Sequence, residues 1–367
     1  MTSPVPIVIA AADLIALVAR LLAAAGLDEK SASTVAQGLV QSDLEGLPSH
    51  GVLLVDLYVD RLLAGSVNGR DGTQVVSDRG CCVVLDAAHS VGQVTGERSM
   101  QIAVSRARQH GAGIVAVRHG FHFGAARRYA LAAAERDCIG IVMCNTRPLM
   151  PAPGGAERVV GNNPIAVAAP CEGAVPLVLD MATSEAAMGK IRLAEKAGEA
   201  IPATWAVRAD GGPTTSPAEA IAGMLLPAAG PKGFGLAVMI DLMCGVLSGG
   251  ASGDKVNPLY GDPKVPYDCS HLFVAIDVAH FCEPSWFRAQ AAAAAERIRG
   301  SRRAPGISEL FVPGEPEWQR AQSAAGKVKV ERAVADKLIK LAQHLRVSAD
   351  PLPALAHVSM ESGYAQT

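Results

Sequence analysis

The sequence predicts an α/β protein with additional helices, and two observations support this fold class. From residue 81 onward, short apolar and β-branched segments alternate with segments of helical periodicity. Before residue 81, only helical patterns are found. The chain has 367 residues, more than a single core usually holds, so a helical part and an α/β part are expected.

Composition and charge narrow the class of function. The chain is 50% hydrophobic and 19% charged with a net charge of −2, which indicates a packed core. No basic run or aromatic-interleaved basic patch is present, so a nucleic-acid partner is not expected. Asp13 and Arg20 interrupt the apolar N-terminal segment, which predicts an amphipathic helix rather than a signal peptide or membrane span. The eight cysteines include no CxxC pair, which indicates free thiols and a cytoplasmic location.

The elements expected first along the chain are helices, at 12–25, 29–43 and 52–63. Gly26 and Gly65 are suited to end the first and third of these helices. Between the second and third helices lies Pro48-Ser49-His50-Gly51. The Ser–His pair could cap a helix, or its hydroxyl and imidazole could pass a proton between them. Both alternatives remain open from the residues alone.

Strands and helices then alternate. Strands are expected at 82–86, 113–117, 138–143, 165–169, 176–179 and 272–277. Helices are expected at about 96–109, from 123, from about 184, and at 236–247, 284–299 and 328–345, with a loop at 306–317. Thr95 is a candidate N-cap for the first of these helices.

The turn after strand 113–117 contains a candidate catalytic group. His122 is expected at or just before a first helical turn, where unpartnered N–H groups lower the pKa of an imidazole and attract anions. A neutral histidine there is a candidate general base near pH 7, although a surface histidine without a role is the alternative. A hydrolytic zinc site on His119 and His122 is disfavoured, because HExxH and a third ligand at suitable spacing are absent.

Three other turns offer ligand-binding groups. Gly161-Asn-Asn-Pro164 precedes a strand, and Asp180 ends one, where it could accept hydrogen bonds from a ribose or an amide. The segment 230–235 places three glycines and Lys232 before a helix, where backbone and a cation can approach phosphates; purely structural glycines are the alternative. The GxGxxG and Walker spacings are absent, so no motif supports a Rossmann domain.

A set of motifs, in order from about residue 10 to 340, resembles the type-2 malate/L-lactate dehydrogenase family. The motifs are SHG (49–51), HFGAA (122–126), GNNPIAVAAP (161–170), LDMATS (179–184), GK (189–190), IP and WAV (201–207), PTTSP (213–217), GPKGFGLAVMIDLMCGVLSG (230–249) and VPGE (312–315). This family includes ureidoglycolate dehydrogenase, sulfolactate dehydrogenase and Δ1-piperideine-2-carboxylate reductase. The stretches MCNTRP, GGAE, TWAV and LLPAAGPKGFGL look most similar to ureidoglycolate dehydrogenase.

The resemblance implies a fold, a cofactor and an oligomeric state. Members have a non-Rossmann nicotinamide-binding α/β core domain, here 76–324, and a helical domain built from both termini, here 1–75 plus 325–367; they are homodimers. The expected contacts of NAD or NADP are His122, Phe123, Gly124, Ala125, Thr146, Asp180, Met181, Ala182, Lys232, Gly314, Glu315 and Pro316. The sequence does not choose between the two cofactors, because Arg127, Arg128 and Arg192 are all candidates to meet a 2′-phosphate.

The resemblance also implies reversible hydride transfer between the cofactor and a small 2-hydroxy or 2-oxo acid of the malate, lactate, sulfolactate or ureidoglycolate type. His122 would be the general acid/base, supported by Ser49 and His50, and no metal would be needed. The alternative within the family is NADPH-dependent reduction of cyclic imino acids (Δ1-piperideine-2-carboxylate or Δ1-pyrroline-2-carboxylate), with the SHG motif as the acid. A non-catalytic binding role would predict loss of the His, Asp and Lys positions, all of which are present.

One position departs from the family pattern. Three residues after the SHG glycine, many members carry an arginine that meets the substrate carboxylate, whereas this chain has Leu54. A carboxylate in a cleft without a partner is strongly disfavoured, so another cation must serve or the substrate differs. Arg147 is the candidate replacement, because the ureidoglycolate-type pattern has an acidic residue there; a solvent-facing arginine is the alternative. Asn163 and Lys190 complete the expected substrate contacts.

Overall fold

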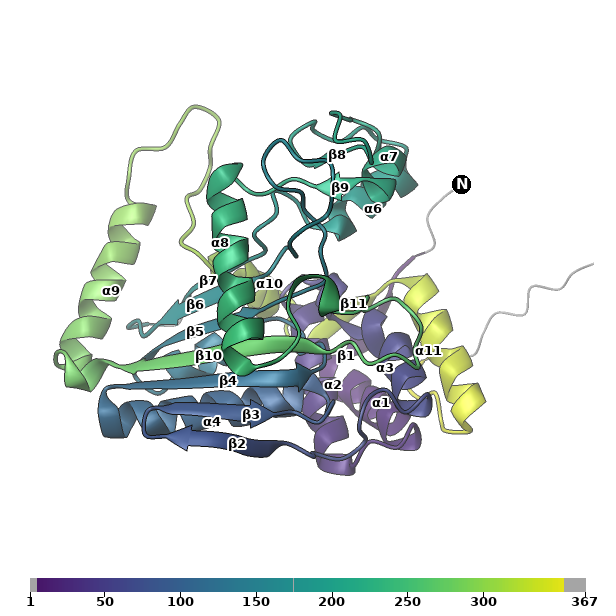
Figure 1. The fold of residues 1–367 in the computed structure, drawn as a ribbon, viewed down its shortest axis with the longest axis horizontal. Coiled ribbons are helices and arrows are strands. Elements are labelled where there is room, and N and C mark those ends of the chain that lie inside the picture. The colour runs from purple at the N-terminus through teal and green to yellow at the C-terminus, as the bar shows by residue number, and fades with distance from the viewer. Residues whose placement is uncertain (1–4, 174, 353–367) are drawn as a thin grey trace, which may run out of the picture.

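The computed structural model describes residues 5–173 and 175–352; residues 1–4 and 353–367 of the expected helical domain lie outside this part. Its centre is a seven-stranded sheet with the order β2-β3-β4-β10-β5-β6-β7 (Figure 1). The strands are β2 (Gln74–Arg79), β3 (Cys82–Asp86), β4 (Ala112–Gly120), β5 (Cys138–Cys144), β6 (Ile165–Ala169), β7 (Leu177–Met181) and β10 (Cys269–Asp277).

The direction of the strands decides where a site can form. Among the described strands of this sheet, only β3 and β4 pair in parallel. Because β10 is antiparallel to both β4 and β5, these two strands run in the same direction. Strand β7 also runs in this direction, because β6 is antiparallel to both β5 and β7. The carboxyl ends of β4, β5 and β7 therefore lie at one edge of the sheet.

Helices cover both faces of the sheet. Helices α4 (Gly92–His110) and α5 (Arg127–Ala134) pack on one face. Helix α8 (Pro231–Asp241) packs on the other face, opposite α4 (Figure 1). Alternation along β4 shows this directly, since Val115 and Val117 belong to the core under α4 while Ala116 belongs to the core under α8. Strands that are covered on both faces are apolar throughout, which explains why they could be predicted as continuous apolar runs of the sequence.

The helical part consists of α1 (Ala11–Ala24), α2 (Glu29–Leu44), α3 (Val55–Leu63) and α11 (Arg332–Leu345). Its buried side chains and those under α4 and α5 form one continuous core. A small sheet joins the two ends of the chain, because β1 (Ile7–Ala10) pairs with β11 (Lys327–Val330).

Two boundaries near the C-terminus differ from expectation. The helix predicted from residue 328 begins at Arg332 instead, because the alternating Lys-Val-Lys-Val segment 327–330 buries its two valines as strand β11. The loop expected to reach residue 317 ends earlier, because α10 (Glu315–Ser323) begins with Pro316 in its first turn. The helix expected at 284–299 is α9 (Pro284–Arg299).

A further lobe was not anticipated from the sequence. Helices α6 (Met188–Ala197) and α7 (Pro217–Ala222) pack with β8 (Ala206–Val207) and β9 (Met224–Leu225) around a separate small core, at the top of Figure 1. These elements are short, so their apolar periodicity is weak in the sequence.

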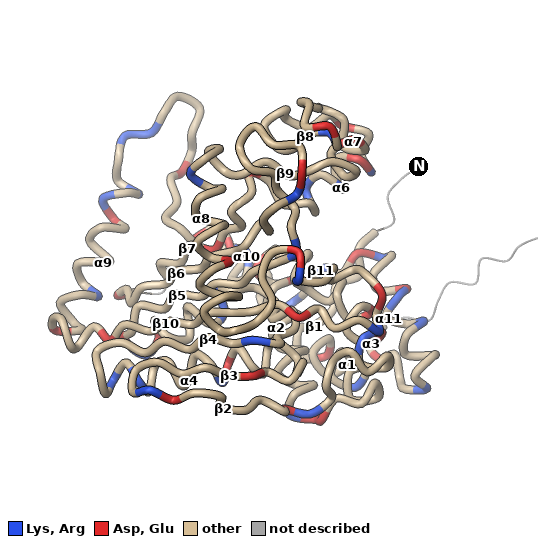
Figure 2. Tube along the Cα trace, in the orientation of Figure 1, with Lys and Arg blue, Asp and Glu red and all other residues tan. Residues whose placement is uncertain are grey.

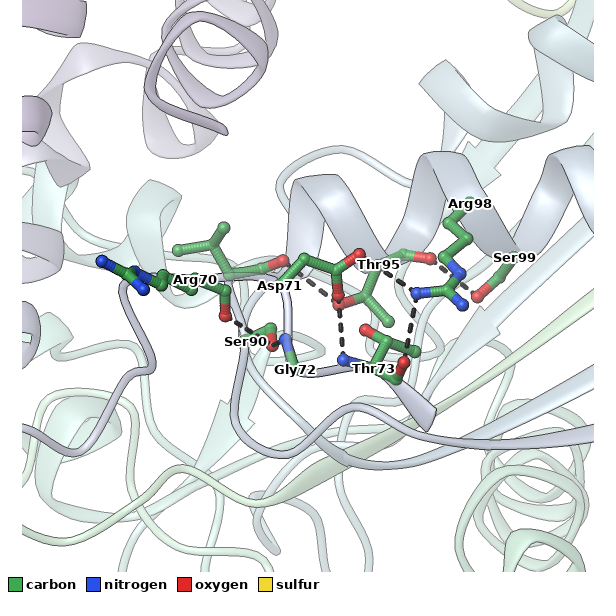
Figure 3. Close-up of polar contacts among 9 residues, drawn as sticks. Arg70, Asp71, Gly72, Thr73, Ser90, Thr95, Arg98 and Ser99 are labelled. Atoms are coloured by element: carbon green, nitrogen blue, oxygen red, sulfur yellow. Dashed lines mark hydrogen bonds and ion pairs between the residues drawn. The ribbon is translucent and has the colours of Figure 1, made fainter. Parts of the chain in front are cut away.

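The expected N-cap at Thr95 is wrong. Helix α4 begins at Gly92, so Thr95 lies within it, and its hydroxyl donates to the carbonyl of Val91 at 3.3 Å (Figure 3). The first part of α4 instead forms an ion pair with the segment that precedes β2, because Arg98 Nη1 lies 3.1 Å from Asp71 Oδ2.

Charged residues of both signs are spread over the outer helices and loops, and the middle of the sheet contains few of them (Figure 2). Within the described ranges, no helix combines the length and apolar character required to cross a bilayer.

Candidate active site

Three of the predicted site residues follow strands that end at the same edge of the sheet. His122 follows β4, Thr146 follows β5, and Asp180 lies at the end of β7. The strand directions described above bring these residues to one edge, although they are distant in the sequence.

Asn163 connects this edge to α8. Its side chain is fully buried, and Oδ1 accepts from the Thr146 N–H at 2.9 Å while Nδ2 donates to the carbonyl of Ala237 at 2.8 Å. The amide expected to contact substrate is therefore engaged by the chain itself. Gly161 permits this close packing, because an added Cβ would lie 2.3 Å from Thr146 Oγ1.

The segment after β7 lies against the beginning of α8. The Ala228 N–H donates to the carbonyl of Thr183 at 2.9 Å, which places Asp180-Met181-Ala182 near that helix. Helix α8 begins at Pro231 rather than at residue 236, so Lys232 lies in its first turn. Helix α6 begins at Met188 rather than near 184, and Lys190 is exposed in its first turn.

The loop that contains Gly314 and Glu315 packs beside β7. The Val178 N–H donates to the carbonyl of Pro313 at 3.1 Å, and a Cβ on Gly314 would lie 2.3 Å from the Val178 side chain. The buried Glu315 carboxylate accepts from the Val312 N–H at 3.0 Å and pairs with Arg299 at 3.0 Å. The Glu315 side chain thus holds the loop in place, and Pro316 follows it in α10.

Asp180 links the end of β7 to the HFGAA segment. Its Oδ2 accepts from the Arg127 N–H at 3.1 Å, at the start of α5. Desolvation by the surrounding chain raises the pKa of Asp180 to about 6, although the residue still reaches solvent. Asp180 can therefore accept hydrogen bonds from a ligand at neutral pH.

The SHG motif meets His122. Ser49 Oγ lies 3.0 Å from His50 Nδ1, and the rings of His50 and His122 stack with their centroids 5.7 Å apart. The helix predicted at 52–63 is a 3₁₀ turn (Val52–Leu54) followed by α3, and neither has a side-chain N-cap. The capping alternative for the Ser–His pair is therefore wrong, and both residues lie in the 3₁₀ turn Pro48–His50.

The turn of the SHG motif is held by Asp43, which was not predicted from the sequence. Asp43 Oδ2 accepts from the Val52 N–H at 2.9 Å, and an added Cβ on Gly51 would lie 1.9 Å from the carboxylate. Burial raises the pKa of Asp43 to about 7. Position 51 can therefore hold only glycine, because any side chain there would collide with the Asp43 carboxyl group.

Tyr58 is a second residue missed from the sequence. It is fully buried on α3, and its hydroxyl lies 2.7 Å from His122 Nδ1, 3.2 Å from the His122 carbonyl oxygen and 2.9 Å from Gln93 Nε2. All three contacts are satisfied when Nδ1–H and the Gln93 N–H donate to the phenol oxygen and the phenol donates to the carbonyl. Nε2 of His122 is then the nitrogen that can accept a proton.

The lowered pKa of His122 arises from burial rather than from a helix terminus. Helix α5 begins only at Arg127, so the expected position of His122 at the first helical turn is wrong. Burial, followed by the electrostatic effects of His50 and His271, lowers the pKa of His122 to about 3. The imidazole is therefore neutral at pH 7, as the sequence predicted for a different reason.

This lowered pKa predicts how His122 responds to acid. An ordinary histidine, with a pKa near 6.5, is mostly protonated at about pH 5.5, whereas His122 should remain neutral there. NMR of histidine-labelled protein, assigned with the His122→Asn variant, measures this directly. Because unfolding restores the ordinary pKa, His122 should lower stability progressively as the pH falls from about 6.5 toward the folded-state value. Half-protonation of His122 near pH 6.5 would contradict this reading.

Replacement of Tyr58 by phenylalanine should lower kcat by about tenfold, because the imidazole loses the partner that fixes its tautomer. The lost Gln93 contact should also reduce the free energy of unfolding by about 1–3 kcal/mol. Steady-state kinetics and urea denaturation measure the two effects. Gln93→Leu, which leaves the bond to His122, is the comparison and should retain more of kcat; equal losses in both variants would remove the special role of Tyr58.

Arg147 occupies a suitable position for an anionic ligand. It follows Thr146, is half-buried, and has no carboxylate partner among the residues that the structure describes. Burial and the positive charges of Arg158 and Arg192 lower the pKa of its guanidinium. Leu54 is only 2% exposed and belongs to the hydrophobic core, so it offers nothing to a carboxylate.

The remaining candidate residues have other partners. His119 Nδ1 lies 2.9 Å from Asp86 Oδ2, and no described third ligand joins it with His122. Arg127 pairs with Glu45 at 3.4 Å, and Arg128 pairs with Glu97 at 2.6 Å, so both of these candidates for a 2′-phosphate already have carboxylate partners. Arg192 lies over the ring of Tyr260, 5.9 Å from its centroid.

Comparison with known proteins shows the family of the chain. Residues 9–339 match the family model described as malate/L-lactate dehydrogenase. The chain belongs to the malate/L-lactate dehydrogenase family. It is therefore a dehydrogenase that acts on CH–OH groups, and the resemblance drawn from its motifs is confirmed.

Relatives of this dehydrogenase differ in the substrate that they are named for. A malate dehydrogenase of Pyrococcus abyssi is 39% identical over 83% of this chain and 85% of its own length. A ureidoglycolate dehydrogenase (NAD⁺) of Escherichia coli O157:H7 is 37% identical over 82% of this chain and 85% of its own length.

Solved structures of the family confirm the α/β fold class. The sulfolactate dehydrogenase of Methanocaldococcus jannaschii superimposes with a TM-score of 0.88 at 32% identity, covering 94% of this chain and 98% of its own. The Δ1-piperideine-2-carboxylate reductase of Pseudomonas syringae superimposes with a TM-score of 0.83 at 26% identity, covering 92% of this chain and all (100%) of its own.

Proposed function

We propose that this dehydrogenase transfers hydride reversibly between a nicotinamide cofactor, NAD or NADP, and a small 2-hydroxy or 2-oxo acid, with His122 as the general acid/base. The observation that carries the proposal is a neutral, half-buried His122 with Nδ1 held by Tyr58 and its ring stacked on His50. A histidine in that state can take the proton of an alcohol at pH 7.

The chain offers groups that fit a nicotinamide dinucleotide. The first turn of α8 presents backbone N–H groups, and Lys232 there has no carboxylate partner among the described residues. An added Cβ on Gly230 would meet nothing within 4 Å, so this backbone faces open space that phosphates can approach. Asp180 supplies a solvent-reaching acceptor. The residues proposed to hold the cofactor are His122, Phe123, Gly124, Ala125, Thr146, Asp180, Met181, Ala182, Lys232, Gly314, Glu315 and Pro316.

In the oxidation direction, Nε2 of His122 removes the hydroxyl proton of the substrate. The bound nicotinamide supplies the hydride acceptor. Tyr58 keeps Nδ1 protonated and the ring in place during this transfer. Ser49 and His50 lie beside the ring, where they orient the substrate oxygen and complete the path of the proton. In the reduction direction, His122 returns the proton to the carbonyl oxygen.

Arg147 is proposed to bind the substrate carboxylate in place of the family arginine that Leu54 replaces. A half-buried guanidinium surrounded by other positive charges is stabilised by an anion. Lys190, which is exposed in the first turn of α6, is proposed as a second cation for the substrate. Asn163 instead positions Thr146 and α8. The substrate class is therefore a small carboxylic acid.

The domain organisation and assembly are part of the same proposal. Residues 1–75 and 325–367 are assigned to a helical domain, supported by the pairing of β1 with β11, and 76–324 to the cofactor domain. A homodimer is expected because the motifs resemble those of a dimeric family, and light scattering tests it.

The alternative function is NADPH-dependent reduction of a cyclic imino acid. The bond between Ser49 and His50 favours it, because it gives the SHG motif a hydroxyl and an imidazole that can protonate an imine nitrogen. Under this alternative His50, rather than His122, is the essential acid.

A substrate panel tests the proposal. Malate, lactate, sulfolactate and ureidoglycolate are assayed with NAD⁺ and NADP⁺, and pyruvate, oxaloacetate and sulfopyruvate with the reduced cofactors. Δ1-piperideine-2-carboxylate is assayed in ammonia-free buffer. Turnover of an acid that is lost in His122→Asn supports the proposal, and turnover of the imine alone, lost in His50→Asn, establishes the alternative.

A further inference from the structure

We propose that Cys144, Cys269 and His271 form a buried binding site for a thiophilic metal ion, next to the active site. We expect this ion to be Zn²⁺. The inference does not depend on the proposed reaction. Among the described residues, these three form the one group whose ligand atoms lie close enough together to bind a metal, all within 4.8 Å of one another.

The sheet brings the three side chains together. Cys144 ends β5, and His271 lies directly opposite it on the neighbouring strand β10. Cys269 lies two residues before His271, across an irregularity in the register of β10, and its Sγ lies 3.3 Å from His271 Nε2. Cys269 and His271 are 0% exposed and Cys144 is 5% exposed, so the cluster is closed to bulk solvent.

His271 has no ordinary structural explanation. Its Nδ1 is buried without a hydrogen-bond partner in the described chain, and its Nε2 meets only a thiol, which is a weak partner. A fully buried imidazole is costly unless its polar atoms are satisfied. A metal ion on Nε2 would replace this weak thiol contact with a strong coordinate bond.

The positions of the two cysteines favour a metal over a disulfide. Cys269 and Cys144 lie on adjacent strands but are not paired with each other, because His271 is the residue opposite Cys144 and the register of β10 shifts between Cys269 and His271. A disulfide requires Cα atoms about 4.4–6.8 Å apart, which is the spacing of residues that pair directly across two strands. A zinc ion holds each sulfur at about 2.3 Å and can bridge a larger separation without moving the strands.

The ligand atoms also select the class of metal. Two thiols and an imidazole are soft or borderline ligands that prefer zinc or copper(I) over magnesium or calcium, which need several oxygens. The cluster contains no carboxylate.

The proposed metal site contacts the residue that follows the proposed catalytic histidine. The ring of His271 stacks on Phe123 with centroids 4.4 Å apart and an interplanar angle of 4°, and Phe123 follows His122 in the chain. An ion bound to His271 would hold the His271 imidazole in place. The stacked Phe123 ring, next to His122 in the chain, would be held with it. We therefore expect metal binding to raise the thermal stability of the whole chain.

Zinc binding by the full-length chain tests the proposal. Protein freed of metal with a chelator, in a thiol-free reductant, is titrated with Zn²⁺ in competition with a chromophoric chelator. One zinc ion per chain and a higher Tm with zinc are expected. Cys144→Ser, Cys269→Ser and His271→Asn should each weaken binding by at least about tenfold.

Cys138→Ser is the matched control, because Cys138 is also fully buried on β5 but lies at the opposite end of the strand. It should bind zinc as the unmodified chain does. If the ligand variants fold poorly, Co²⁺ added to the unmodified chain gives an independent readout, since bound thiolates produce an intense near-ultraviolet charge-transfer band. Absence of that band, or equal zinc affinity in the unmodified chain and the Cys144→Ser and Cys269→Ser variants, overturns the proposal.

Discussion

Replacing His122 with asparagine is expected to lower kcat/KM for the accepted hydroxy acid by about 10²–10⁴-fold, because the site loses the group that accepts the alcohol proton. Asparagine can still donate a hydrogen bond toward Tyr58, so the packing around the position should be retained. Binding of the reduced cofactor, followed by its fluorescence, should be weakened far less than kcat/KM, because the other proposed cofactor contacts remain. Steady-state kinetics with the best acid from the panel measures the effect.

His119→Asn is the matched control for this experiment. His119 lies near the end of β4, three residues before His122, but pairs with Asp86 outside the cluster around His122. Its loss should leave kcat/KM within about threefold of the unmodified enzyme, a change of under 1 kcal/mol. Comparable losses in the two variants would show that the segment 119–122 as a whole matters, and would remove His122 as the general base.

Replacing Arg147 with alanine is expected to lower kcat/KM for every accepted acid by about 10–100-fold, the value of a charge-assisted hydrogen bond. Most of the change should appear in KM, because the carboxylate is bound equally in the ground and transition states. Arg147→Lys keeps the charge but not the planar pair of donors, so it should recover only part of the loss.

Arg208→Ala is the control for a general change in charge. Arg208 is exposed and pairs with Asp210 at 3.2 Å in the small lobe. Its removal should leave KM for the acids unchanged. If Arg147→Ala leaves kcat/KM for all acids unchanged, the substrate carboxylate is bound elsewhere. The proposal that Arg147 replaces the family arginine at position 54 is then wrong.

Most of the fold could be predicted from the sequence where elements are long or fully buried. Strands β4 and β5 are apolar throughout, and α1 and α11 have a clear helical periodicity, so local patterns were sufficient there. The short elements β8, β9 and α7 were missed, because two to six residues cannot establish a period.

The chain by itself determined the chemical groups: the two histidines, the glycines beside α8 and the motif order that marks the family. Only the tertiary structure decided their partners and protonation. Tyr58 meets His122 across 64 positions of sequence, and burial rather than a helix terminus keeps that imidazole neutral. Cys144 and His271 likewise become neighbours only through strand pairing. Pairing and burial are properties of segments distant in sequence, and no local pattern encodes which of them will meet.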